Sequence, residues 1–217
     1  MNRFDPGRLS AVLIPLGAGL VALLIGAVIL LLLGANPIDA YASMVSGSFG
    51  SLNAFADTLV KAGPLLFVGI GTCIAFRCGV INIGGEGQIV MGGICATLVA
   101  LSFKDLPGLV LLPLGLLAGF LGGATWAAIA GVLKIKFRVN EVLSTIMLNS
   151  IAGLIMTFLL TGTLMDPSSA DASIRIPQTE RMPLAVDLLR WVPTRMHIGV
   201  LLAVVMAILV YVLLWRT

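Results

Sequence analysis

The stretch that decides the fold is GVINIGGEGQIVMGG, residues Gly79–Gly93. It is rich in glycine and carries the polar side chains of Asn82, Glu86 and Gln88, yet apolar sequence flanks it on both sides. A charge at the bilayer centre costs about 2.5–3.5 kcal/mol even on a lenient insertion scale, and non-helical backbone at that depth is tolerated only inside protein or beside a wet cavity. The stretch is therefore either a surface loop or a broken, protein-buried segment, and such interrupted hydrophobic segments favour a functional centre.

The composition is that of a membrane protein. The chain has 217 residues, of which 59% are hydrophobic and 11% are charged, and its mean hydropathy is +1.11. Soluble domains carry about 25% charged residues, so we expect an all-α, polytopic integral membrane bundle. The net charge of +3 does not indicate a nucleic-acid partner, because basic residues in the short cytoplasmic loops of a membrane protein account for a positive net charge.

Six apolar runs predict helices that span the hydrocarbon layer of about 30 Å. The third of them is short for a span unless the glycine-rich stretch is itself embedded. The six runs cover Leu9–Gly34, Thr58–Phe76, Gln88–Phe103, Gly108–Leu133, Glu141–Gly162 and Ile198–Trp215. The first run is too long for the apolar part of a signal peptide, which is the alternative for it. The mixed segment Ile38–Ala56 predicts an interfacial helix at the outer surface. We expect one transmembrane domain over residues 1–217.

Two four-residue periodicities mark helix faces. Small residues recur at this period in the fourth run and predict a packing ridge, where a neighbouring helix can approach closely. The ridge consists of Gly115, Gly119, Gly123, Ala127 and Gly131. In the fifth run Glu141, Thr145 and Asn149 share one face. That polar face indicates either hydrogen bonding between helices or part of a functional site.

Basic residues set the expected orientation. With six spans, one side of the membrane receives Arg3, Arg8, Arg77, Lys134, Lys136, Arg138 and Arg216, whereas the opposite short loops hold Lys61 and Lys104. Positive residues favour the cytoplasm, so both termini are expected there. The proline-containing segment 163–197 is then a long external loop.

Cysteine and histidine patterns predict neither a metal site nor a cofactor. The three cysteines, Cys73, Cys78 and Cys95, are odd in number and form no C-x-x-C motif, which argues against a disulfide framework or a zinc site. The single histidine, His197, lies near an expected membrane interface, where a loop role is more common than metal binding.

Two segments resemble a known family. FRCGVINIGGEGQIVMGG, residues Phe76–Gly93, is similar to a signature of bacterial ABC importer permeases, and VNEVLSTIMLNSIA, residues Val139–Ala152, resembles their second hallmark. The family transports branched-chain amino acids, ribose and nucleosides, and the nucleoside branch is most similar. Ile81 stands where the family usually has phenylalanine. Family members continue with further spans, so the chain is expected to be an N-terminal portion.

The resemblance implies a transport subunit in the bacterial inner membrane rather than an enzyme. It implies no catalytic residue and a pathway for a nucleoside or related sugar-like solute. Its expected partners are a separate ABC ATPase, an extracytoplasmic solute-binding protein and a second permease subunit, within the lipid bilayer. ATP hydrolysis is expected from the ATPase, because the sequence has no G-x-x-x-x-G-K-[ST] motif.

Seven polar residues are the expected substrate pathway or structural centre: Asn82, Glu86, Gln88, Asn140, Glu141, Thr145 and Asn149. The first three would order the broken segment, and the other four would offer hydrogen bonds from a facing helix. Glu86 is expected to be buried in protein, with partners that need its carboxylate. An ion-coupled secondary transporter or channel, and a non-transporting membrane scaffold, remain alternative functions.

Overall fold

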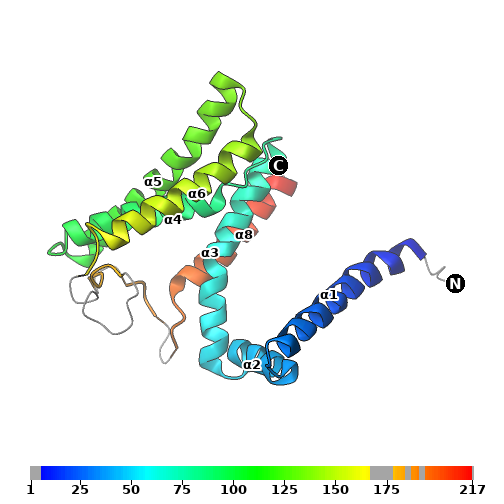
Figure 1. Cartoon of the computed structure of the whole chain (residues 1–217). Coiled ribbons are helices and arrows are strands. Elements are labelled where there is room, and N and C mark those ends of the chain that lie inside the picture. Colours follow the sequence, from blue (N-terminus) through cyan, green and yellow to red (C-terminus); the bar gives the residue numbers. More distant parts are fainter. Residues whose placement is uncertain (1–5, 167–177, 184–186, 191–193, 217) are drawn as a thin grey trace. The chain divides into compact units, whose positions relative to one another are not determined.

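The computed structural model describes residues 6–166, 178–183, 187–190 and 194–216, and in this part of the chain the regular structure is entirely helical (Figure 1). The helices are α1 (Pro6–Leu32), α2 (Pro37–Phe49), α3 (Leu52–Arg77), α4 (Gly85–Ser102), α5 (Gly108–Phe137), α6 (Glu141–Thr161) and α8 (Ile198–Arg216). Extended structure is limited there to isolated bridges, Met165 with Thr179 and Arg190 with His197. The all-α prediction is confirmed.

The prediction of about six spans is also confirmed. Six helices, all except α2, are long and apolar enough to cross a membrane. The interfacial segment expected at Ile38–Ala56 is divided: α2 ends at Phe49, and α3 begins at Leu52. The expected external loop, 163–197, falls partly outside the described residues.

Two helix boundaries differ from the apolar runs. α3 begins at Leu52 rather than Thr58, because a helix continues through polar residues when their hydrogen bonds stay local; the Thr58 hydroxyl donates to the Ala54 carbonyl at 3.0 Å. α5 extends past Leu133 to Phe137, so Lys134 and Lys136 lie in its last turn rather than in a loop. Positive charges there interact favourably with the helix dipole.

The chain divides into two compact units, Met1–Thr58 and Leu59–Thr217. In the first unit α2 packs against α1. The Tyr41 hydroxyl donates to the Leu23 carbonyl at 2.6 Å, and a Cβ at Gly26 would come within 2.8 Å of that hydroxyl. Glycine at position 26 therefore makes room for the tyrosine. The single-domain organisation expected from the sequence stays a prediction.

In the second unit α4, α5 and α6 pack against one another and form the core (Figure 1). α3 reaches α8 through Arg77, which donates to the Leu214 carbonyl at 2.8 Å and lies 4.8 Å from the centre of the Trp215 ring. The C-terminal ends of α3 and α8 are thereby joined. The loop that follows Arg77 leads directly into α4.

Candidate functional site

The glycine-rich stretch is a short loop followed by a helix. Residues 78–84 connect α3 to α4, and α4 begins at Gly85, three residues before the expected Gln88. The Asn82 Oδ1 atom accepts a hydrogen bond from the Gly84 amide at 2.9 Å and another from the Gln88 Nε2 at 3.3 Å. These two amide side chains therefore fold the loop onto the first turn of α4.

Asn149 of α6 bridges this loop and the helix. Its Oδ1 accepts from the Gly87 amide at 2.8 Å, and its Nδ2 donates to the Ile83 carbonyl at 3.0 Å. The first amides of a helix have no partner within the helix, and Gly84 at the N-cap has no side chain to supply one. Asn149 therefore accepts a hydrogen bond from an amide in the first turn of α4, as a capping side chain normally does, although it belongs to another helix.

The same position explains why residue 87 is glycine. A Cβ at Gly87 would come within 2.9 Å of both Asn149 Oδ1 and the indole Nε1 of Trp126. The Trp126 Nε1 is buried and has no hydrogen-bond partner among the described residues. Side chains of α5 and α6 thus converge on one glycine of α4, and any larger residue there must displace them.

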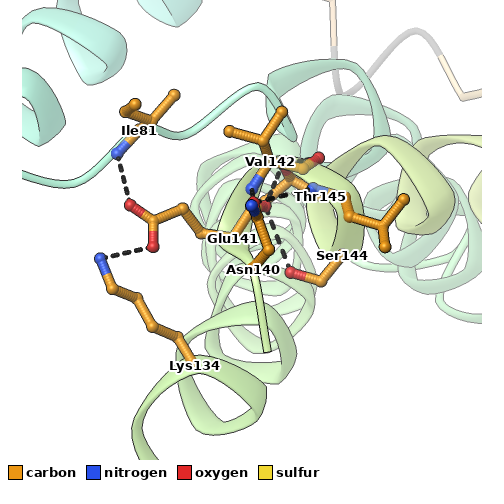
Figure 2. Close-up of polar contacts among 8 residues, drawn as sticks. Ile81, Lys134, Asn140, Glu141, Val142, Ser144 and Thr145 are labelled. Carbon is orange, nitrogen blue, oxygen red and sulfur yellow. Dashed lines mark hydrogen bonds and ion pairs between the residues drawn. The ribbon is translucent and has the colours of Figure 1, made fainter. Parts of the chain in front are cut away.

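Glu141 joins three elements, as Figure 2 shows. Its Oε1 accepts from the Ile81 amide in the loop at 3.3 Å, and its Oε2 pairs with the Lys134 Nζ of α5 at 2.6 Å. The two side chains are partly exposed, at 20% for Glu141 and 35% for Lys134. The carboxylate of α6 therefore ties the loop to the end of α5.

Asn140 and Thr145 serve the geometry of α6 itself. Asn140 is the N-cap, and its Oδ1 accepts from the Val142 and Leu143 amides at 2.9 and 3.4 Å. The Thr145 hydroxyl donates to the Glu141 carbonyl at 2.7 Å, and Thr145 is only 4% exposed. Thr145 lies beside Gly84, where an added Cβ would be 3.2 Å from its own.

Glu86 departs from expectation, because it is exposed rather than buried. Its neighbour Gly87 is buried and faces Asn149. Successive helical residues are rotated by about 100°, so the Glu86 side chain points away from that contact. The helix dipole still favours the negative charge of Glu86 in the first turn of α4. The role of Glu86 in the substrate pathway or structural centre stays a prediction.

A cavity of about 270 Å³, here called the polar cavity, gathers four of the expected residues. Its polar lining consists of Asn82, Gln88, Lys134, Glu141 and Thr145, with Cys78 beside them. Glu86, Asn140 and Asn149 do not line it. Lys134 was not predicted as a site residue, because its charge was assigned to a loop. Its place near the end of the helix that precedes Glu141 is the sequence feature that could have indicated the ion pair.

The small-residue ridge of α5 follows α4 along its length. A Cβ at Gly119 would lie 3.4 Å from the Gly92 carbonyl oxygen, and one at Gly123 would lie 3.1 Å from that of Gln88. At one end Ala127 and Gly131 line the polar cavity, and at the other end Gly115 lines a different cavity. The middle of the ridge thus contacts α4 backbone, while both ends face open space.

Among the described residues, no group of three or more histidine, cysteine, aspartate or glutamate side chains is placed to hold a metal ion. The polar cavity instead offers amide, hydroxyl and ammonium donors and carbonyl and carboxylate acceptors. Such a set can form hydrogen bonds with a neutral polar solute.

Curated relatives match most of the chain. The guanosine ABC transporter permease protein NupP of Bacillus subtilis is 32% identical over 94% of this chain and 58% of its own length. The glucose ABC transporter permease protein TsgB13 of Haloferax volcanii is 34% identical over 91% of this chain and 53% of its length. The nucleoside ABC transporter permease protein NupB of Lactococcus lactis is 33% identical over 95% of this chain and 58% of its length. The chain therefore spans somewhat more than half the length of these relatives.

No solved structure matches the chain significantly. The family model described as "Branched-chain amino acid transport system / permease component" matches residues 54–217. This region contains the loop before α4, the polar cavity, four whole apolar spans and all but the first two residues of α3. The chain is a multi-pass membrane protein that belongs to this family of transport permease components.

Proposed function

We propose that the chain forms part of the translocation pathway of an ABC importer for a nucleoside or a related sugar-like solute. The observation that carries this proposal is similarity over more than nine-tenths of the chain to permeases named for guanosine and for nucleosides. The similarity to a glucose permease extends the proposed solutes to sugars. Nucleosides and sugars share neutral, hydroxyl-rich rings.

The chemistry of the polar cavity supports a neutral solute. The charges of Lys134 and Glu141 are paired with each other at 2.6 Å, so neither demands a charged ligand. Asn82 and Gln88 add carboxamide groups, which both donate and accept hydrogen bonds as sugar hydroxyls do. We infer that these residues order the inner end of the pathway and contact solute there.

The same proposal includes the energy source for transport and the orientation of the chain in the membrane. ATP is hydrolysed by a separate ATPase subunit, the solute is delivered by an extracytoplasmic binding protein, and a second permease subunit completes the pathway. Arg77, Lys134, Lys136 and Arg138 lie on the cytoplasmic side with both termini, in keeping with the positive-inside rule. The polar cavity then opens toward the ATPase.

Uptake measurements test the proposal. The chain is expressed with its ATPase, its binding protein and the second permease subunit in bacteria that lack nucleoside uptake, and radiolabelled guanosine is followed with uridine, glucose or leucine as competitor. We expect guanosine uptake that uridine inhibits and leucine does not, and that stops on ATP depletion but survives ionophores that dissipate proton and sodium gradients. Uptake that follows an ion gradient without ATP would instead identify an ion-coupled transporter.

A further inference from the structure

A cavity of about 570 Å³ lies at the turn between α5 and α6, and we call it the turn cavity. It is lined by Ile81, Lys134 and residues 138–142, so it borders the ion pair of Lys134 and Glu141 drawn in Figure 2. The charges of that pair balance each other, which leaves the guanidinium of Arg138 as the unbalanced charge of the lining. Arg138 forms no ion pair within the part of the chain that the structure describes. The turn cavity therefore favours an anion.

Arg138 stands where the backbone favours glycine. It is the C-cap of α5 and is left-handed, with φ 54° and ψ 29°, and no other non-glycine residue has a positive φ among those described. The Cβ atom makes this conformation unfavourable for L-residues, and helices that end in this way usually carry glycine there. Such a backbone cost points to a function of the side chain. We infer that the guanidinium accounts for arginine at this position.

The length of α6 places the turn at the level of the lipid headgroups. α6 has 21 residues, which extend over about 31 Å at 1.5 Å per residue. The hydrocarbon layer is about 30 Å thick, so α6 crosses it with little length to spare. Arg138 precedes the first residue of α6 by three positions and therefore lies beside the phosphates of the bilayer.

The last turn of α5 alternates apolar and basic side chains. Ile135 is 84% exposed and Phe137 is 64% exposed, and the basic residues Lys136 and Arg138 beside them are exposed as well. Acyl chains cover apolar side chains at this depth, while long basic side chains reach from the hydrocarbon boundary to the headgroups. One lipid molecule meets both needs, whereas the acidic surface of a soluble partner meets only the need for a negative charge.

We propose that the turn cavity binds the phosphate of an anionic phospholipid, with Arg138 as the phosphate-binding residue. Basic pockets at the ends of membrane helices bind lipid headgroups in this way. The planar guanidinium can donate to two phosphate oxygens at once. Asn140 also lines the cavity; its Oδ1 caps α6, which leaves its Nδ2 to donate to the same phosphate. This lipid site goes beyond the proposed transport function and does not depend on it.

The first test measures lipid binding directly. The purified chain is titrated with phosphatidylglycerol or phosphatidylcholine, and bound lipid is followed by native mass spectrometry. Arg138→Gln is compared with Lys136→Gln, because each variant removes one positive charge at the end of α5 and Lys136 lies outside the turn cavity. We expect Arg138→Gln to raise the Kd for phosphatidylglycerol about tenfold or more, the loss typical of charge-assisted hydrogen bonds, and Lys136→Gln to change it little. Equal weakening by the two variants would mean a diffuse surface charge and overturn the site.

The second test separates the backbone of Arg138 from its side chain. Arg138→Gly relieves the left-handed backbone, so its Tm in neutral detergent without lipid should equal or exceed that of the unmodified chain. Added phosphatidylglycerol should raise the Tm of the unmodified chain, as a bound ligand does, but not that of Arg138→Gly, and phosphatidylcholine should separate the two less. An equal response of both chains to phosphatidylglycerol would refute the proposal. If Arg138→Gln keeps the lipid response but loses association with the ATPase, Arg138 serves a protein interface instead.

Discussion

Gly92 of α4 and Gly119 of α5 meet backbone to backbone, but the contact is unequal. A Cβ at Gly92 would come within 2.8 Å of the Gly119 carbonyl oxygen, whereas a Cβ at Gly119 would lie 3.4 Å from that of Gly92. Gly92→Ala is therefore expected to destabilise the chain by about 1–3 kcal/mol, the usual cost of overpacking. Gly119→Ala should be neutral or stabilising, since alanine favours helix by up to about 1 kcal/mol. Thermal unfolding in detergent compares the two, and equal losses would contradict the geometry.

Asn149 is expected to be a major support of the loop before α4. Asn149→Leu leaves the Gly87 amide and the Ile83 carbonyl without their partner. Gly87 is buried, and an unsatisfied buried amide costs about 1–3 kcal/mol. Faster hydrogen exchange at the Gly87 amide and a lower Tm are the expected results. Ser150→Ala is the control, because Ser150 is exposed and its hydroxyl makes only a 3.5 Å bond within α6. A loss for Asn149→Leu no larger than that for Ser150→Ala would contradict this role, since helix propensity alone favours both variants.

The Lys134–Glu141 ion pair is expected to stabilise the loop through Ile81. Glu141→Gln keeps an acceptor for the Ile81 amide but removes the ion pair, so its Tm should fall less than that of Glu141→Ala. A double-mutant cycle with Lys134→Gln isolates the pair, and the coupling should weaken as salt rises. Additive effects of Lys134→Gln and Glu141→Gln would mean that the contact contributes nothing.

Lys104 should titrate at unusually high pH. Its hydrogen bond and charge interaction with Glu180, at 2.6 Å, hold the pKa of Lys104 above its ordinary value of 10.5. A raised lysine pKa means that the pair contributes stability below the ordinary value and loses it as pH rises past the raised one. At pH 9 we expect Glu180→Gln to speed acylation of the Lys104 amine, measured by mass spectrometry, with Lys136 as the internal reference. An unchanged ratio of the two rates would contradict the prediction.

Topology is tested at described positions on each side. In a cysteine-free chain, Gln178→Cys should react with an impermeant thiol reagent added to intact cells, and Lys136→Cys should react only after permeabilisation. The expectation follows from the distribution of basic residues. Reversed labelling would invert the orientation and place the polar cavity on the outer side.

The spans could be predicted because their signal is local. Burial in lipid demands long apolar runs, so α6 and α8 end within one residue of the expected limits. The starts of α3 and α4 could not be predicted in this way. The polar residues before Thr58 suggested a later start for α3, but local hydrogen bonds continue the helix through them. The glycines at 84 and 85 suggested that the break extends to Gln88, but α4 begins at Gly85 and Asn149 accepts from the amide of its first turn.

The candidate site was predictable in its residue types but not in its partners. The four-residue spacing predicted that Glu141, Thr145 and Asn149 share a face, and all three meet the loop or the start of α4. The pairing of Lys134 with Glu141 depends on how the end of α5 lies against the start of α6, and no local sequence pattern specifies this geometry. The exposure of Glu86 likewise depends on which side of α4 meets α6.

The bridge from Asn149 to Gly87 joins residues 62 positions apart in the sequence, and it has a consequence for biogenesis. A ribosome synthesises α4 and all of α5 before it reaches Asn149. During that interval the first turn of α4 has neither a capping side chain of its own nor the carboxamide that later serves it. We therefore expect the glycine-rich loop to reach its final form only after α6 has been synthesised.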